Sequence, residues 1–159
     1  MTEFTLLPAN LKDLGALRIL EKECFGRDAW PLIDLIGVLS FPGIIRIKAV
    51  VNNVMVGFVA GEVHQDDKLG WITTIGVSPA YRQQGIATGL LNAVERDLNM
   101  NRIRLSVRKS NTPAIKMYQK YGYSQVGQWP GYYEDREDAL IFEKKIQEDF
   151  LAKDNGFRE

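Results

Sequence analysis

Residues that bind metals or form disulfides are almost absent from this sequence. Among its 159 residues there is one cysteine, Cys24, and one histidine, His64. A single cysteine cannot form a disulfide within the chain, and a structural zinc site takes four ligands, mostly cysteines and histidines. We therefore expect no intrachain disulfide and no metal. Cys24 falls in an apolar helical pattern, and we interpret it as a small core residue.

Net charge and long apolar runs are also lacking. The 20 basic and 20 acidic residues give a formal net charge of +0, whereas a general electrostatic binder of nucleic acid carries a basic excess. No apolar run is long enough to span a membrane, and the first residues lack the basic segment and the apolar stretch of a signal peptide. We expect no nucleic acid and no membrane among the partners, and a cytoplasmic protein.

The composition that is present is ordinary for a globular protein, with 45% hydrophobic and 25% charged residues. A chain of this length can bury the core of one domain. The patterning predicts one domain over residues 1–147, followed by a charged, frayed C-terminal tail over residues 148–159. The sequence is compatible with both a monomer and a dimer.

Hydrophobic periodicity predicts helices that alternate with strands. Asn10 is a suitable N-cap for the first helix, and the pair Asn52-Asn53 tolerates the left-handed backbone of a tight hairpin. The order of the elements predicts an α/β (α+β) fold, in which helices cover both faces of a single mixed sheet. The expected helices cover residues 11–25, 31–39, 88–99 and 111–121, and the expected strands cover residues 4–7, 44–51, 54–63, 70–77, 102–108, 123–128 and 139–145.

One turn is the most informative segment of the chain. It runs from Arg82 to Ala87 with the pattern Arg/Gln-x-x-Gly-x-Gly/Ala, between an expected strand and an expected helix. Small residues at the start of a helix let backbone N–H groups approach an anion, and the helix dipole favours a phosphate there. Taken alone, the turn is equally consistent with a phosphorylated cofactor and with an ordinary helix start.

The motifs on either side of this turn favour the cofactor. Ile75-Gly76-Val77-Ser78-Pro79 precedes it, and Ser110-Asn111-x-x-Ala114-x-x-x-Tyr118-x-x-x-Gly122-Tyr123 follows it. With these motifs the sequence resembles the GNAT acetyltransferase superfamily, and more narrowly the protein N-terminal acetyltransferases of the ribosomal-protein-alanine (RimI) type. The resemblance extends over residues 2–146. It implies the GNAT-like acyl-CoA N-acyltransferase fold, a mostly antiparallel sheet of about seven strands flanked by about four helices.

The resemblance implies acetyl-CoA as cofactor, with CoA as product. The backbone of Ile75, Gly76 and Val77 would hydrogen-bond the pantetheine arm, as an added strand does. Asn111 would contact the cofactor near the thioester, and Tyr118 would act as general acid beside the sulfur. The residues that would cradle the pyrophosphate are Arg82, Gln83, Gln84, Gly85, Ile86, Ala87 and Thr88.

These residues also have structural interpretations. Ile75 and Val77 can be core residues of a strand, and Tyr118 can be a packed aromatic residue on a helix. Asn111 can cap the helix that follows it, and this role is compatible with contact to a cofactor.

Tyr132, Tyr133 and the acidic residues up to Ala139 resemble a segment that N-terminal acetyltransferases carry between their last two strands. There the segment forms one wall of the peptide groove, so Tyr132 and Tyr133 are expected to bind substrate. A solvated acidic loop over two packed aromatic residues explains the segment equally well. The acidity would suit a cationic amine as well.

The chain departs from these relatives at Ser106. They place a glutamate there as general base, and a serine at its normal pKa cannot take a proton from an ammonium group. The expected catalytic residues are therefore Tyr118 and Ser106, with the base missing or replaced. The candidates for the base are Glu62, which is also expected to bind substrate, His64, and a water held by Ser106, Thr73 or Thr74.

This departure bears on the acceptor. At pH 7 about one α-amine in seven is neutral, against about one lysine side chain in 2,500. A weak base therefore suits an N-terminal α-amine, for example that of a ribosomal protein, better than a lysine. The amine would attack the thioester directly, with the Val77 amide polarising the carbonyl. The alternatives are a small amine, such as a polyamine, an amino sugar or an antibiotic, and a non-catalytic CoA-binding module, which Ser106 would favour.

Overall fold

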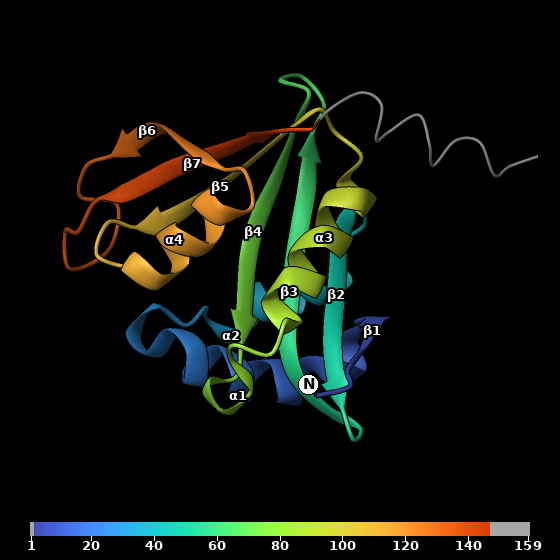
Figure 1. Cartoon of the computed structure of the whole chain (residues 1–159). Coiled ribbons are helices and arrows are strands. Elements are labelled where there is room, and N and C mark those ends of the chain that lie inside the picture. The colour runs from blue at the N-terminus through green and yellow to red at the C-terminus, as the bar shows by residue number, and fades with distance from the viewer. Residues whose placement is uncertain (1, 147–159) are drawn as a thin grey trace, which may run out of the picture. The chain divides into compact units, whose positions relative to one another are not determined.

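The structure is a computed structural model that describes residues 2–146 (Figure 1). The tail expected over residues 148–159 lies outside the described residues. The chain divides into two compact units. Of the described residues, the first unit comprises 2–62 together with Ile72–Leu98, and the second comprises Val63–Trp71 together with 99–146.

Antiparallel strands joined by a tight hairpin organise the first unit. β2 pairs with β1 on one side and with β3 on the other. Asn52 and Asn53, with φ of 48 and 64, close the β2–β3 hairpin in the left-handed conformations that the sequence predicts. The strands that contribute to this unit are β1 (Thr5–Pro8), β2 (Ile44–Val51), β3 (Val54–His64) and β4 (Leu69–Val77).

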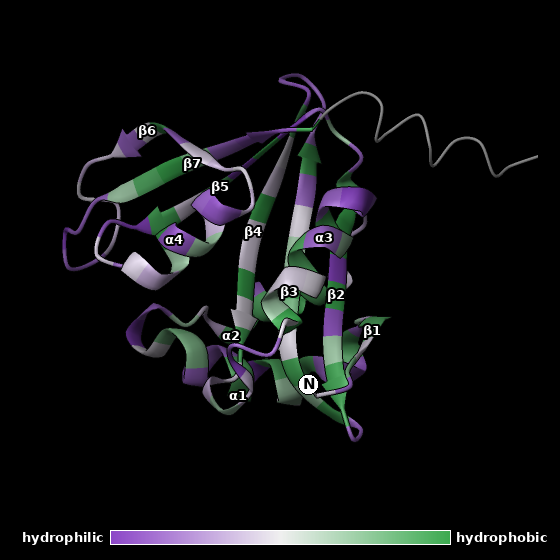
Figure 2. Cartoon of the chain, in the orientation of Figure 1, coloured by the Kyte–Doolittle hydropathy of each residue, from purple (hydrophilic) through white to green (hydrophobic). Residues whose placement is uncertain are grey.

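Helices cover both faces of the sheet in this unit. Adjacent residues of a strand point to opposite faces. On β3, Phe58 packs in a core cluster with apolar residues of α1 (Leu14–Phe25) and α2 (Leu32–Ser40), whereas Gly57 lies against α3 (Ile86–Leu98). The first two helices therefore lie on one face and α3 on the other. Where β3 is visible in Figure 2, its green and white segments are interrupted by purple near its C-terminal end.

The second unit contains paired strands and one α-helix. β7 pairs antiparallel with β5 and with β6, and the start of β4 pairs in parallel with β5, with Gly70 opposite Ile103. The elements are β5 (Arg102–Arg108), α4 (Thr112–Lys120), β6 (Ser124–Trp129) and β7 (Ala139–Lys145).

The described part of the chain thus forms one seven-stranded sheet, in the order β1-β2-β3-β4-β5-β7-β6, with four α-helices. The β4–β5 pair is parallel, and the β1–β2, β2–β3, β5–β7 and β6–β7 pairs are antiparallel. The mixed, mostly antiparallel α/β fold expected from the sequence is confirmed.

Several helix boundaries differ from the sequence prediction, and two of the differences have a clear physical reason. The helix after the glycine turn begins at Ile86 and not at Thr88, because Ile86 is only 1% exposed and anchors the first helical turn in the core. α2 begins one residue later than expected, since Pro31 has a ψ of 153 and serves as the N-cap. Residues 86 and 87 of the predicted phosphate turn therefore belong to a helix.

Candidate active site

The predicted phosphate turn has the backbone geometry of an anion cradle. Gln83 and Gly85 have φ of 61 and 83, and α3 begins at the next residue, Ile86. Left-handed residues in such a turn direct neighbouring backbone N–H groups toward one concave side. There they add hydrogen-bond donors to those at the N-terminus of a 13-residue helix. A Cβ added at Gly85 would meet no atom within 4 Å, so the space beside the turn is open. The turn therefore fits a pyrophosphate.

Arg82 is tied to the end of β4. The Val77 carbonyl accepts a hydrogen bond from Nε of Arg82 at 3.1 Å and another from Sγ of Cys24 at 3.4 Å. The first bond fixes the exposed guanidinium next to the turn, where its positive charge suits a phosphate. A side-chain hydrogen bond therefore links the turn to the end of β4 within the first unit.

Gly76 lets α1 approach this part of β4. A Cβ at Gly76 would lie 3.1 Å from Sγ of Cys24, so a larger residue would push the helix away from the strand. Cys24 is half-buried, and burial raises the pKa of its thiol. A thiol that is protonated and packed against the backbone is a poor nucleophile, which agrees with the packing role expected for Cys24.

A buried carboxylate that the sequence prediction missed lies beside β4. Glu21 of α1 is 3% exposed. Its Oε2 accepts a hydrogen bond from the Trp30 backbone N–H at 3.2 Å, and its Oε1 accepts one from Oγ1 of Thr74 at 3.4 Å. Burial raises the pKa of the Glu21 carboxyl, and both hydrogen bonds partly oppose the rise. Glu21 thus links α1 to β4. The missed signal was spacing, because Glu21 follows Leu17 by four residues on the buried face of the helix.

We expect Glu21→Gln to be more stable than the wild type at pH 7. The folded-state pKa of this carboxyl is raised, so its contribution to stability is full below the unfolded pKa and is lost as pH rises through the folded pKa. Glutamine keeps the shape and a carbonyl oxygen without the charge. Urea unfolding between pH 4 and pH 8 should show a gain that shrinks toward pH 4. Glu3→Gln, at an exposed position, is the control, and an equal gain there would contradict the explanation.

In the second unit, Tyr118 is buried on α4. It is 6% exposed, and its ring meets that of Tyr123 edge-on, with the ring centroids 5.8 Å apart. Burial, helped by the nearby Tyr133, raises the pKa of the Tyr118 phenol. The hydroxyl therefore stays protonated at neutral pH, as a general acid must. Asn111 is the N-cap of the same helix, and its side chain accepts a hydrogen bond from the Ala114 backbone N–H at 3.3 Å.

The Tyr132–Tyr133 loop is held by Arg108. The Arg108 guanidinium lies 4.1 Å from the centre of the Tyr133 ring, and its Nη1 contacts Asp135 at 3.0 Å and Glu137 at 2.7 Å. Asp135 and Glu137 therefore help to shape the loop. Tyr132 is 55% exposed, and its ring packs edge-on against that of Tyr133 at 5.1 Å. The exposed Tyr132 thus packs on Tyr133, which Arg108 holds in place.

Ser106 lies on β5 between two arginines of the same strand face. It is half-buried and pairs with Ile141 of β7, while Leu105 and Val107 are buried on the opposite face. Arg104 contacts Glu143 at 3.0 Å through its Nε.

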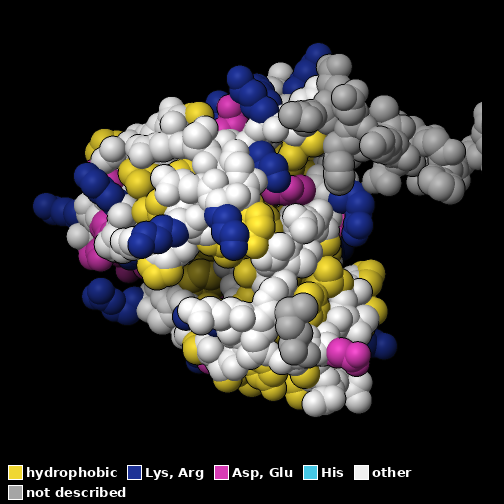
Figure 3. Space-filling view, in the orientation of Figure 1, with side chains coloured by type: hydrophobic (Ala, Val, Ile, Leu, Met, Phe, Trp, Pro, Cys, Tyr) yellow, Lys and Arg dark blue, Asp and Glu magenta, His cyan; other side chains and the backbone are white. Residues whose placement is uncertain are grey.

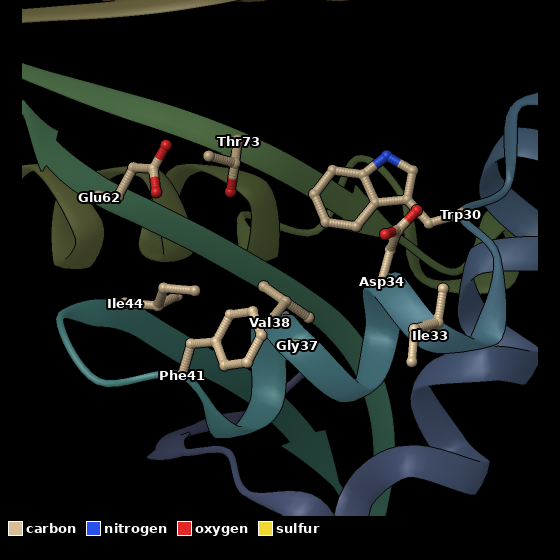
Figure 4. A pocket seen from close by; sticks show the side chains of 9 residues that line it. All are labelled: Trp30, Ile33, Asp34, Gly37, Val38, Phe41, Ile44, Glu62 and Thr73. Carbon is tan, nitrogen blue, oxygen red and sulfur yellow. The ribbon is translucent and has the colours of Figure 1, made fainter.

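The structure places the candidate bases in different surroundings. Glu62 and Thr73 line one pocket of the first unit (Figure 4), whereas the Thr74 hydroxyl donates a hydrogen bond to Glu21. His64, in the second unit, packs its ring against Trp71 with a centroid distance of 6.0 Å. Glu62 and Thr73 are therefore the two candidates that the structure brings together.

Within residues 2–146, no group of three or more His, Cys, Asp and Glu side chains is placed to hold a metal ion. In the same part of the chain, no helix is both long enough and apolar enough to cross a membrane. Basic and acidic side chains are scattered over the face shown in Figure 3.

Comparison with known proteins identifies the family. The model for the Acetyltransferase (GNAT) family matches residues 17–123. This chain belongs to the GNAT acetyltransferase family. It is 30% identical over 158 residues to an N-alpha-acetyltransferase of Saccharolobus solfataricus, a match that covers 91% of this chain and 94% of the relative.

Solved structures agree with this assignment. The ribosomal-protein-S18-alanine N-acetyltransferase of Escherichia coli matches this GNAT protein with a TM-score of 0.82 at 25% identity, over 91% of this chain and 95% of that one. NAA60 of Arabidopsis thaliana, crystallised with acetyl-CoA, shares the fold with a TM-score of 0.81 at 23% identity, over 91% and 100% of the two chains. The GNAT family uses acetyl-CoA, so the predicted enzyme class and cofactor are confirmed.

Proposed function

We propose that this GNAT acetyltransferase acetylates the N-terminal α-amine of proteins, ribosomal proteins among them. The observation that carries the proposal is the loop in which Arg108 fixes Tyr133 and leaves Tyr132 exposed. A pre-shaped loop with tyrosine hydroxyls suits the backbone of an extended peptide, because little freedom is lost on binding. The names of the relatives, N-alpha-acetyltransferase and ribosomal-protein-S18-alanine N-acetyltransferase, support the same substrate class.

The residues of the first unit are proposed to bind the donor. The backbone of Ile75, Gly76 and Val77 holds the pantetheine arm, and the Val77 N–H polarises the carbonyl. The turn and first helical residues from Arg82 to Thr88 hold the pyrophosphate at the N-terminus of α3. Acetyl-CoA supplies the thioester whose acetyl group is transferred.

The residues of the second unit are proposed to handle protons. Ser106 orients the water that takes the proton from the attacking amine, while Asn111 contacts the donor near its thioester. As the new N–C bond forms and the C–S bond breaks, Tyr118 donates its proton to the departing sulfur and regains one from solvent. Cys24 takes no part, so the transfer is direct, without an acyl-enzyme.

We expect this enzyme to prefer an α-amine over a lysine side chain by about 350-fold at pH 7, which is the ratio of their neutral fractions. Two versions of one peptide provide the measurement. In the first, the N-terminus is free and the lysine is blocked; in the second, the N-terminus is blocked and the lysine is free. Thiol release gives the rates, mass spectrometry locates the acetyl group, and the doubly blocked peptide gives the background. Faster acetylation of the lysine would contradict the proposal.

The same assay separates the competing functions. A panel of polyamines, amino sugars and aminoglycoside antibiotics tests the small-amine alternative. A small amine that reacts faster than every peptide would support this alternative and contradict the proposal. If acetyl-CoA binds and no amine releases thiol, the protein is a non-catalytic CoA-binding module. The cytoplasmic location and the oligomeric state, monomer or dimer, stay predictions.

A further inference from the structure

One pocket of the first unit is lined by none of the residues proposed to hold the donor. Its volume is about 490 Å³, within the range of small-molecule sites. In Figure 4 its lining side chains come from α2 and the segments that flank it, and from the facing strands β2, β3 and β4. They are Trp30, Ile33, Asp34, Gly37, Val38, Phe41, Ile44, Glu62 and Thr73.

The walls of this pocket are apolar and reach the surface. Ile33 is 72% exposed and Phe41 is 62% exposed, although both are large hydrophobic residues. Gly37 helps to shape the wall, because a Cβ there would lie 3.2 Å from Cε2 of Phe41, so the ring can rest against the helix only at a glycine. Exposed apolar side chains around a pocket are typical of a binding site.

The charged residues of the pocket have one sign. Asp34, in the first turn of α2, and Glu62, on β3, are both carboxylates, and no lysine or arginine lines the pocket. An apolar pocket with two carboxylates suits a ligand that joins a large apolar group to a cation. The N-terminal residue of a protein has this chemistry when its side chain is hydrophobic, because it joins an ammonium group to an apolar group.

The pocket also lies on the donor's strand. Thr73, which lines it, precedes Ile75 on β4 by two residues, a distance of about 7 Å along a strand. An amine held near Thr73 and Glu62 is therefore close to the backbone proposed to hold the pantetheine arm. This proximity assigns the pocket to the acceptor.

We propose that this pocket binds the first side chain of the acceptor protein, and that this side chain is large and apolar, as in methionine, leucine or phenylalanine. Asp34 and Glu62 face the positive charge of its N-terminus before the amine loses a proton. The inference rests on the proposed function, because it needs an acceptor that carries a side chain next to the reacting amine.

The first experiment uses the full-length protein and peptides that differ only in their first residue. A buried leucine side chain adds three carbons to alanine, so kcat/KM should be about 10- to 100-fold higher for leucine than for alanine. Methionine and phenylalanine should behave like leucine, and glycine like alanine. Equal values across the set would overturn the inference while N-terminal acetylation stands. If no peptide is acetylated, the proposed function itself fails.

The second experiment changes the walls. Ile33→Asn and Phe41→Ala should each lower the leucine-to-alanine ratio several-fold, and because both side chains are largely exposed, thermal unfolding should change little. The matched control is Ile19→Asn, at a 63% exposed isoleucine of α1 that does not line the pocket. Glu62→Gln should raise KM for all peptides and leave the ratio unchanged. An unchanged ratio in both wall variants, or an equal change in the control, would overturn the inference.

Discussion

Tyr118→Phe should lower kcat by about 10²- to 10³-fold, the usual contribution of a positioned general acid. The Kd for acetyl-CoA should stay close to that of the wild type, because phenylalanine keeps the ring that packs edge-on against Tyr123. The departing thiolate would then have to take its proton from water. Single-turnover kinetics separate the chemical step from product release, and equilibrium binding gives the Kd.

A neighbouring tyrosine provides the control. Tyr123 is 3% exposed and packs against Tyr118, so Tyr123→Phe removes a hydroxyl from the same cluster without removing the proposed acid. Its kcat should match that of the wild type. The raised pKa of Tyr118 adds a second test, since wild-type activity should not fall as pH approaches 10, where an ordinary tyrosine ionises. Equal kcat values for Tyr118→Phe and the wild type would remove Tyr118 from the mechanism.

Gly85→Ala should weaken acetyl-CoA binding by about tenfold or more, equivalent to about 1.4 kcal/mol. Gly85 has a φ of 83, where a residue with a Cβ is strained by roughly 1–2 kcal/mol. The space beside it is open to a ligand. The variant must therefore either hold a strained turn or move the N–H groups that are proposed to face the pyrophosphate. Calorimetric titration with acetyl-CoA gives the Kd.

Gly43→Ala is a matched control for this strain. Gly43 has a φ of 82, and a Cβ there also meets nothing within 4 Å, but the residue lies in the turn before β2. Both variants should lose a similar amount of folding stability, measured by urea unfolding. Only Gly85→Ala should lose affinity for acetyl-CoA. Equal affinity losses in the two variants would show that the turn before α3 does not hold the pyrophosphate.

Local patterns were sufficient for the secondary structure. β2, β5 and β7 have the bounds expected from alternation and turn residues, and Asn10 caps the first helical segment as expected. These features depend on residues that are close in sequence, so propensity and periodicity determine them. The start of α3 was misplaced by two residues because burial of Ile86, a tertiary effect, extends the helix into the glycine turn.

Three parts of the donor site could be predicted from the sequence, because each is a short motif with a local geometry. They are the glycine turn, the helix with Asn111 and Tyr118, and the strand Ile75–Val77. They determined the family and the acetyl-CoA donor. Contacts between segments far apart in the chain could not be predicted in this way. Glu21 meets Thr74 across 53 residues, and Arg108 fixes Tyr133 from another element.

Sequence alone therefore determined the order of the elements, the fold class and the donor, since these follow from local backbone preferences and short motifs. Only the tertiary structure decided which acidic residues shape a loop, that Glu21 is buried beside β4, and that Asp34 and Glu62 share an apolar pocket with Trp30 and Phe41. The physical reason is that pairing, burial and cavity shape arise from contacts between segments far apart in the chain, which no local pattern encodes.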